Sequence, residues 1–297
     1  MSASTPAMTL GSRKSVLEEL RARVAALERG GGKDGERGGG RPPGGLSGAG
    51  VRAAALLGVE AIDSALPGGL LLGSMHEIAG EGGAATGFTA ALLVRLARFA
   101  GGGAPVLWCL SRPELYGPGL AALGVDPARL IVAYARSRTD LLWAMEEGLR
   151  CPALAAAVAE AGNVGVKESR RLQLAAEAGG VTGFLLREGG NPGTGRSAGR
   201  SVGRSVSAAT AWRVAPAPQG EEQGEEQAED QAEEPARASP TARWRLELVR
   251  CRGGASGSWI VDWNDETGDF TLAAALPDRP HRAAPGKGEG RTGGRAG

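Results

Sequence analysis

The chain has 297 residues, a formal net charge of +1, and 50 glycines with 17 prolines. Much of the glycine and proline gathers in three tracts, and the roughly 200 residues outside them are enough for one buried core. A net charge this close to zero excludes steering of nucleic acid by the molecule as a whole, so any such contact must come from local patches.

Cysteine and histidine usage argues against two further classes of protein. The three cysteines share no Cys-x-x-Cys spacing, and the two histidines are His76 and His281, so neither a disulfide framework nor a metal site is predicted. No basic and apolar leader opens the chain, and no apolar stretch approaches the length that crosses a bilayer. We therefore expect a cytoplasmic protein without membrane contact.

The first predicted element is a helix over residues 15–28, in which Ser15 and Glu18 form a capping box. Its apolar stripe consists of Leu17, Leu20, Val24 and Leu27. Because the stripe is short for an independent coiled coil, two interpretations are open: a helix packed on its own domain, or an interface helix for a partner or for self-association. Residues 30–50 are typical of a flexible linker, so residues 1–50 are predicted to be a helix and a linker.

Residues 51–187 alternate between apolar strands and helices, which predicts a mostly parallel sheet covered on both faces. The predicted strands span residues 75–79, 105–110, 130–133, 153–159 and 181–186. The predicted helices span residues 89–100, 139–149 and 167–178. Alanine favours a helix over residues 153–159, but the break at Pro152 and the flanking helices favour a strand. Thr139 is a candidate N-cap, and Gly179 with Gly180 stops the last helix.

Residues 188–240 are of low complexity and are predicted to be a disordered linker. They hold three Gly-Arg-Ser units, followed by an acidic run over residues 221–234. The arginines of those units are Arg196, Arg200 and Arg204. Over residues 241–276 apolar positions such as Trp244, Trp259 and Phe270 alternate with polar ones, which predicts three antiparallel strands that complete the core. Residues 277–297 are predicted to be a disordered tail.

The segment over residues 75–94 reads as a strand, a Gly-rich loop and an apolar helix, the context of a phosphate-binding loop. Gly82 and Gly87 have the separation of the pattern G-x-x-x-x-G-K-[ST], but Phe88 stands in the lysine place. Without that positive charge the β- and γ-phosphates are not neutralised, so no catalysis and no cofactor are predicted. Weak nucleotide binding and a plain helix cap that never meets phosphate stay open. The degenerate loop comprises Gly82, Gly83, Gly87, Phe88 and Thr89.

Two carboxylates stand where a nucleotide-hydrolysing site would need them. Glu160 follows the strand predicted over residues 153–159, and Glu114 lies just past the strand over residues 105–110. The first could hold a metal ion and the second could activate water, while ordinary surface acids are the alternative. His76 falls inside a predicted strand and is interpreted as a packed or edge histidine, so no catalytic arrangement is assigned.

Four segments resemble the RecA superfamily and, more narrowly, the ImuA family, which is also labelled SulA-like. They are GVEAIDSALPGGLLLGSMHEIAG at residues 58–80, VLWCLSRPELYGPGLAALGVDPARLI at 106–131, ESRRLQLAAEAGGVTGFLLR at 168–187 and RWRLELVRCRGGASGSWIVDW at 243–263. Together with the closing LPDRP, these segments stand in the order that the family has them. The resemblance implies an α/β fold with a RecA-like P-loop core.

The resemblance also implies a function that spacing alone does not. ImuA-like proteins act with ImuB, an inactive relative of the Y-family polymerases, and with an error-prone C-family DNA polymerase in damage-induced translesion synthesis under the SOS response. We therefore expect a non-catalytic accessory factor that serves these polymerases as a scaffold, with DNA and RecA as further candidate partners. The alternatives are a DNA-dependent ATPase of recombinase type and an SOS-linked inhibitor of cell division.

In RecA-like proteins the loop after the last core strand binds DNA, and residues 188–240 take its place here. The three arginines of the Gly-Arg-Ser units are therefore candidate contacts for a phosphate backbone, although the acidic run beside them favours a solvated linker. Arg170 and Arg171 open the helix over residues 167–178 and are candidate contacts for DNA or a partner. A solvated helix face is the alternative for this pair.

Overall fold

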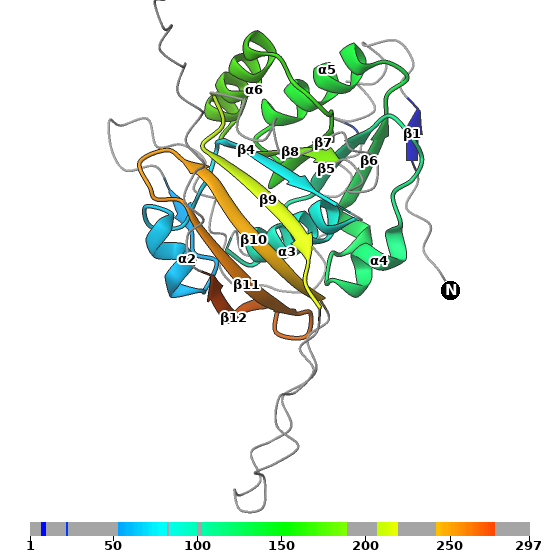
Figure 1. Ribbon diagram of the computed structural model, residues 1–297. Helices are drawn as coiled ribbons and strands as arrows, with labels where there is room; N and C mark the ends of the chain where they lie inside the picture. The colour runs from blue at the N-terminus through cyan, green and yellow to red at the C-terminus, as the bar shows by residue number, and fades with distance from the viewer. Residues whose placement is uncertain are drawn as a thin grey trace, which may run out of the picture.

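The computed structural model describes residues 53–81, 83–99, 103–188, 207–218 and 242–276, together with Ala22 and the backbone of β1 (Ala7–Thr9). These residues build a mixed α/β fold with a ten-stranded sheet, whose parallel part has helices on both faces (Figure 1). The strand order is β1-β6-β5-β7-β8-β4-β9-β10-β11-β12. A hydropathy scan of the described helices finds none with the length and apolar character of a membrane span.

Five strands that follow one another in the chain form the centre of the parallel part of the sheet. They are β4 (Met75–Gly80), β5 (Val106–Leu110), β6 (Leu130–Tyr134), β7 (Ala156–Glu160) and β8 (Thr182–Glu188). All pairings among them are parallel, which confirms the predicted mostly parallel sheet. The chain starts at β4 in the interior, runs out to β5 and β6, and returns through β7 and β8 to pair with β4 again.

Helices cover both faces of this sheet. They are α2 (Glu60–Ala65), α3 (Ala84–Phe99), α4 (Gly117–Ala122), the 3-10 turn η1 (Pro127–Arg129), α5 (Arg138–Leu149) and α6 (Val166–Gly179). A short antiparallel pair, β2 (Ala54–Ala55) with β3 (Leu70–Leu71), flanks α2. As predicted, α6 stops at a glycine pair, because Gly180 adopts the left-handed conformation with φ 71° that favours glycine.

Two predicted helix starts are wrong. The helix predicted from Thr89 begins instead at Ala84. Residues 84–88 form an additional helical turn, whose apolar side chains pack against the sheet. The N-cap of α5 is Ser137 and not Thr139, since the Ser137 hydroxyl accepts the backbone N–H of Asp140 at 3.1 Å. The helix predicted over residues 15–28 lies outside the described residues except for Ala22, which is helical and exposed.

The C-terminal half of the sheet holds the three predicted antiparallel strands and one strand that was not predicted. The predicted strands are β10 (Ala242–Cys251), β11 (Gly257–Asn264) and β12 (Asp269–Leu276). The unpredicted strand β9 (Thr210–Pro216) lies within the range 188–240 that the sequence predicts as linker. It is ordered because it pairs with β4 on one side and β10 on the other, and because Trp212 is fully buried.

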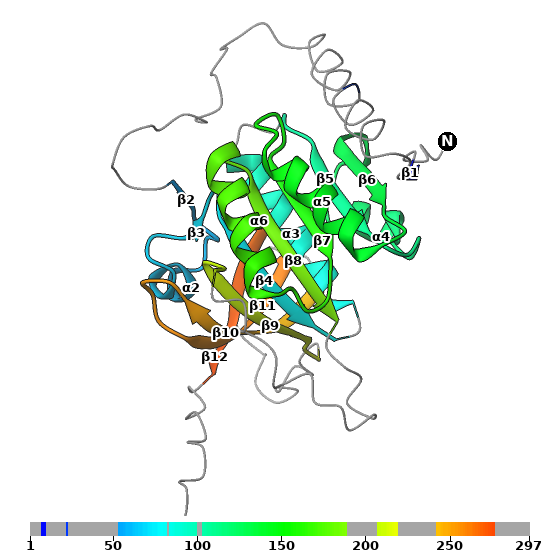
Figure 2. The same ribbon diagram turned by 90° about the horizontal axis from the view of Figure 1, so that it is seen from above.

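Each face of the sheet has its own hydrophobic core. One core joins α2, α3 and α4 to the sheet and contains most of the buried aromatic residues, while the other joins α5 and α6 to the sheet (Figure 2). Alternation along each strand separates the two. On β4, for example, Ile78 belongs to the α3 side and Met75 belongs to the α6 side.

Candidate functional site

The carboxyl ends of the parallel strands define the edge of the sheet where a site is expected. Because β4, β5, β7 and β8 run in the same direction, the loops that follow them start at one edge. Ligands of open α/β sheets bind at this edge, where successive crossovers diverge. The degenerate loop after β4, Glu114 after β5 and Glu160 at the end of β7 all fall on it.

The connection between β4 and α3 is shorter than a phosphate-binding loop requires. Only residues 81–83 separate the strand from the helix, and Gly82 lies outside the described residues. A Cβ added at Gly80 would lie 2.6 Å from the backbone nitrogen of Ala85, so glycine is needed for this tight turn. Gly83 has a φ of 81° and ends the turn. Residues 87–89 are therefore helical and belong to the first two turns of α3.

The side chains in the first two turns of α3 are committed to packing. Phe88 has no exposed surface, and its ring centroid lies 5.8 Å from that of Trp212, 6.0 Å from that of Trp244 and 5.8 Å from that of Phe270. The Thr89 hydroxyl donates to the Ala85 carbonyl oxygen at 2.7 Å and is also fully buried. These residues hold α3 against β9, β10 and β12.

The two candidate carboxylates have different surroundings. Glu160 accepts a hydrogen bond from the indole Nε1 of Trp108 at 2.9 Å. The Glu114 side chain is 66% exposed and lies 3.9 Å from the guanidinium of Arg112. Among the residues that the structure describes, no three histidine, cysteine, aspartate or glutamate side chains gather as a metal site would need.

His76 is a packed histidine near the start of β4. Its ring nitrogens lie 2.8 Å from the Thr210 hydroxyl and 2.9 Å from the Leu71 carbonyl oxygen. Because the Leu71 carbonyl can only accept, Nε2 carries the proton of the neutral ring, and Nδ1 accepts from the Thr210 hydroxyl, which itself accepts the indole N–H of Trp212 at 2.8 Å. Burial lowers the pKa of His76 to about 4, which keeps the ring neutral.

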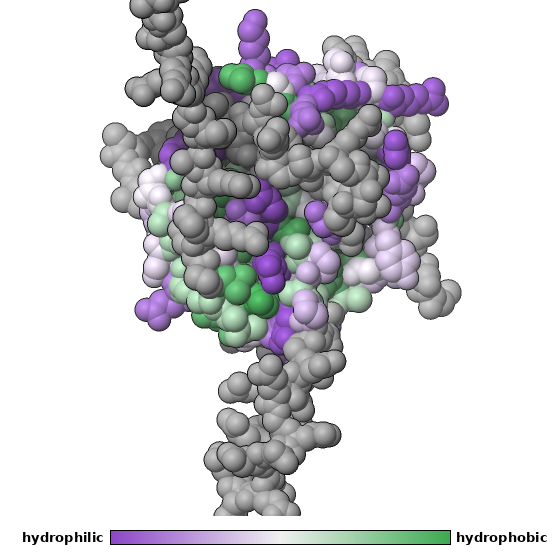
Figure 3. Space-filling model, in the orientation of Figure 1, coloured by the Kyte–Doolittle hydropathy of each residue, from purple (hydrophilic) through white to green (hydrophobic). Residues whose placement is uncertain are grey.

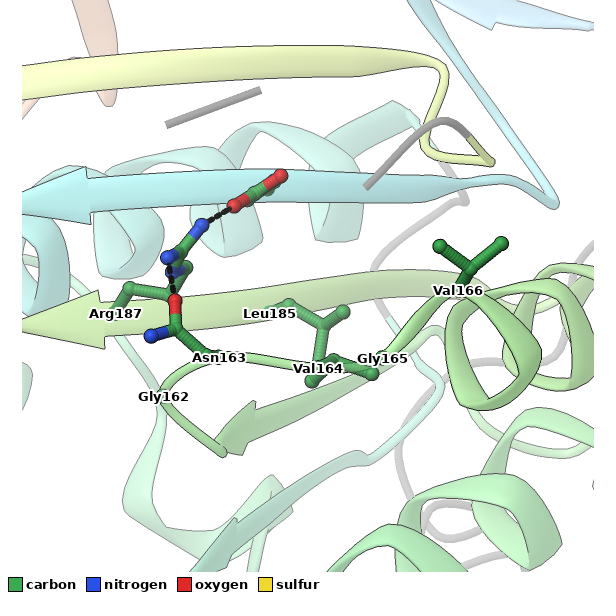
Figure 4. Close-up of a pocket in the computed structure, with 8 residues that line it drawn as sticks. Gly162, Asn163, Val164, Gly165, Val166, Leu185 and Arg187 are labelled. Carbon is green, nitrogen blue, oxygen red and sulfur yellow. Dashed lines mark hydrogen bonds and ion pairs between the residues drawn. The ribbon is translucent and has the colours of Figure 1, made fainter. Parts of the chain in front are cut away.

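A cavity of about 340 Å³ opens beside the first turn of α6, on the face of the sheet away from α3. It is lined by Glu77, Gly162, Asn163, Val164, Gly165, Val166, Leu185 and Arg187. We call it the α6 cavity. Arg187 lies between the Glu77 carboxylate, with which it forms an ion pair, and Asn163, to whose side-chain oxygen it donates (Figure 4). Glu77 is 1% exposed and Arg187 is 8% exposed.

Sequence reasoning did not identify the α6 cavity. The one signal in the sequence is a charged residue inside each of two apolar strands, Glu77 in β4 and Arg187 in β8. Charged residues are almost never fully buried unless they are paired, so their presence in central strands predicts a pair. The parallel pairing of β4 with β8 brings these two together.

The first turn of α6 carries a carboxylate that the surrounding groups hold in its charged form. Glu168 Oε2 accepts the backbone N–H of Gly165 at 2.9 Å and a guanidinium N–H of Arg138 at 3.1 Å. The hydrogen bond from Gly165, and then the charge of Arg138, lower the pKa of Glu168 below its ordinary value. This hydrogen bond is one of the two contacts of a capping box. The other contact needs a side chain at the N-cap position, which Gly165 lacks.

The two arginines predicted to contact DNA or a partner have different environments. Hydrophilic residues gather over the end of the molecule that α5 and α6 form (Figure 3). Arg171 pairs with Glu146 at 2.6 Å, and Glu146 also pairs with Arg150 at 2.6 Å. Arg170 is exposed and forms no ion pair with a described residue. The remaining candidate residues, namely Leu17, Leu20, Val24, Leu27, Arg196, Arg200 and Arg204, lie outside the described residues.

Comparison with known proteins gives a relationship that extends over most of the chain. No family model matches it. The chain is 39% identical over 245 residues to "Protein ImuA" of Caulobacter vibrioides, with the same values in two strains. The matched region spans 76% of this chain and 91% of the Caulobacter protein. Identity at this level over nearly the whole relative confirms the resemblance, and the chain belongs to the ImuA family.

Proposed function

We propose that this protein is a non-catalytic accessory factor in damage-induced translesion DNA synthesis, and that it serves error-prone polymerases as a scaffold in the cytoplasm. The observation that carries the proposal is the 39% identity to "Protein ImuA" across 91% of that protein. The proposed partners are those that the ImuA resemblance implies: an ImuB-like inactive Y-family polymerase and an error-prone C-family DNA polymerase. DNA and RecA are further candidate partners.

The proposal includes a RecA-like core with a degenerate phosphate loop. It is supported by the interior position of β4, by the helix α3 that directly follows β4, and by the crossovers that leave from β4 and return beside it. The lysine place of the loop pattern is Phe88, deep in an aromatic cluster. A ring in that position cannot supply the charge that phosphoryl transfer needs.

The first experiment is deletion of the gene, followed by measurement of ultraviolet-induced mutation frequency and survival. Loss of induced mutation with a modest loss of survival is the expected result. Induced mutation that persists while survival falls would contradict the proposal and favour recombination or control of cell division.

A second experiment separates a scaffold from an ATPase. In an ATPase the Thr89 hydroxyl would serve the metal ion, whereas here it donates to the Ala85 carbonyl oxygen inside α3. Thr89→Val keeps the shape and removes the hydroxyl, so we expect it to restore induced mutation in the deletion strain as wild type does. Failure to restore it, at a protein level equal to that of wild type, would support the DNA-dependent ATPase instead.

A further inference from the structure

Strands β9 to β12 leave one face of the sheet without a described helix. Their large apolar side chains, such as Trp212, Trp244 and Trp263, belong to the core on the α3 side. Side chains that alternate with these point to the opposite face, and the core under α5 and α6 contains no described residue of these four strands. Figure 1 looks onto this opposite face, and no described helix crosses in front of the four strands. No described element therefore covers it.

Arginine side chains dominate this opposite face, which we call the arginine face. Arg213 lies in register with Glu247 and Arg243 with Asp262, and each couple forms an ion pair. Arg245 is exposed and forms no ion pair with a described residue. On β9, β10, β11 and the turn after β10, five arginines stand against the two carboxylates of these pairs, so the face carries a surplus of three positive charges. The arginines are Arg213, Arg243, Arg245, Arg250 and Arg252.

Two of these arginines lie close together at the far end of β10. Arg250 is in register with Ala211, which is in register with Glu77 of β4, so the small alanine lets the guanidinium approach Glu77. Burial lowers the pKa of Arg250 most, the charge of Glu77 opposes this, and the like charge of Arg252 lowers it further. Glu77 is already paired with Arg187. An anion on the arginine face would therefore offset the repulsion between Arg250 and Arg252.

The chain itself carries a polyanion that is attached to this face. Residues 221–234, the acidic run, contain eight carboxylates and neither lysine nor arginine, and they lie outside the described residues. The connection that contains them leaves β9 after Pro216 and enters β10 at Ala242. Both of its ends lie beside the arginine face, because the N–H of Ala217 donates to the Arg243 carbonyl oxygen at 3.1 Å.

The length of this connection is sufficient to cover the arginine face. From Arg243 to Arg250 the strand extends about 23 Å. The middle of the connection is about 12 residues from either end, so it can reach about 40 Å from the strand ends. Attachment at both ends also keeps the acidic run at an effective concentration in about the millimolar range, which favours it over an acidic segment of another protein.

We propose that the acidic run, residues 221–234, docks on the arginine face and supplies the negative charge that β9, β10 and β11 lack. Ion pairs between exposed side chains are individually weak, so the contact depends on several of them together and is released by salt. The inference rests on the charges of the sheet and on the attachment of the run, and it does not depend on the proposed scaffold role.

The first test is carbodiimide crosslinking of full-length Arg245→Lys, which joins a lysine to a carboxylate in direct contact. At about 0.05 M salt we expect crosslinks within one chain between position 245 and the acidic run, and at about 1 M salt we expect their loss. Arg112→Lys, in the exposed loop after β5, is the control and should give none. If the lysine at 245 reacts with an amine reagent but forms no crosslink to the run, the proposal is wrong. Crosslinks only between chains would assign the acids to a second copy and would also overturn it.

The second test measures how fast a protease that cuts after glutamate cleaves the acidic run in the full-length protein. A docked run must leave the face before it is cut, so Arg245→Glu should speed cleavage about threefold at low salt. The difference should disappear at about 1 M salt, because the charges are then screened. Arg112→Glu makes the same change of charge in the loop after β5 and should cleave as wild type does. Equal rates for all three folded proteins at low salt would refute the contact.

Discussion

The ring of Phe88 on α3 packs 5.8 Å, centroid to centroid, from the indole of Trp212 on β9. Both side chains are fully buried, and Trp244 and Phe270 complete a four-ring cluster that ties α3 to β9, β10 and β12. The position that holds lysine in a phosphate-binding loop is here a central position of the core. The packing of Phe88 on Trp212 also explains why the strand β9 forms between two low-complexity tracts.

Replacement of Phe88 by lysine should destabilise the protein without creating ATP hydrolysis. Truncation of a buried phenylalanine to alanine costs about 3–5 kcal/mol, and a lysine here would add an unpaired charge in an apolar cluster, whereas leucine keeps most of the apolar volume. Urea unfolding of Phe88→Lys and Phe88→Leu measures the effect, and the leucine variant should lose much less stability. Hydrolysis of ATP by a folded Phe88→Lys protein would mean that an intact nucleotide site surrounds this position.

The burial of His76 should make stability depend on pH. The unfolded histidine binds a proton near pH 6.5, but the folded one binds it only near pH 4. Between these values the unfolded state holds more protons, so the free energy of unfolding should fall by about 1.4 kcal/mol for each unit that the pH is lowered. His76→Gln removes this contribution. Urea unfolding of both proteins between pH 4.5 and 7 checks it, and parallel curves would show that His76 is not buried neutral.

The thiol of Cys109 should report global unfolding. It lies on β5 with no exposed surface, and burial raises its pKa to about 12, whereas Cys151 and Cys251 are half-buried. In the double variant Cys151→Ser/Cys251→Ser, a thiol reagent at neutral pH should label Cys109 only in unfolded molecules. The measured rate should rise with urea in step with the unfolded fraction. Rapid labelling of the native double variant would contradict the packing of β5.

The contact between Glu168 and Gly165 should stabilise the start of α6. Glu168→Gln should cost about 0.5–1 kcal/mol at neutral pH, because the charged acceptor of the Gly165 N–H is lost. The pKa of Glu168 is lowered in the folded state, so its contribution exists above the ordinary pKa and disappears as the pH falls through the folded value. Thermal unfolding at neutral and at acidic pH measures the difference. Glu147→Gln on α5 is the control, and an equal loss in both variants would refute the cap.

Much of the fold could be predicted because local chemistry decides it. The apolar runs of β5, β6 and β8 and the glycine pair after α6 are signals that act within a few residues. The alternation of Trp244, Leu246 and Leu248 with polar residues likewise predicts β10 with one buried face. The sequence does not predict the start of α3, because two glycines and a loop pattern outweigh the helical preference of residues 84–85.

The candidate site could be predicted only in part, because its parts meet through long-range pairing. The predicted loop after β4 occupies the expected edge of the sheet, but the role of Phe88 depends on strands that follow more than a hundred residues later. The α6 cavity depends on the pairing of Glu77 with Arg187, which only the β4–β8 register brings together. The residue pattern within one β-strand does not specify how that strand is aligned with its neighbour.

By itself, the amino-acid sequence determined the α/β class, the family, and the absence of lysine from the phosphate-loop pattern, since each of these is written in local residue order. The tertiary structure alone decided that Phe88 is a core residue, that β9 forms, and that a charged pair lies beneath a cavity at α6. The physical reason is that burial and the pairing of buried charges are properties of several strands at once. Neither is determined until the sheet has brought those strands side by side.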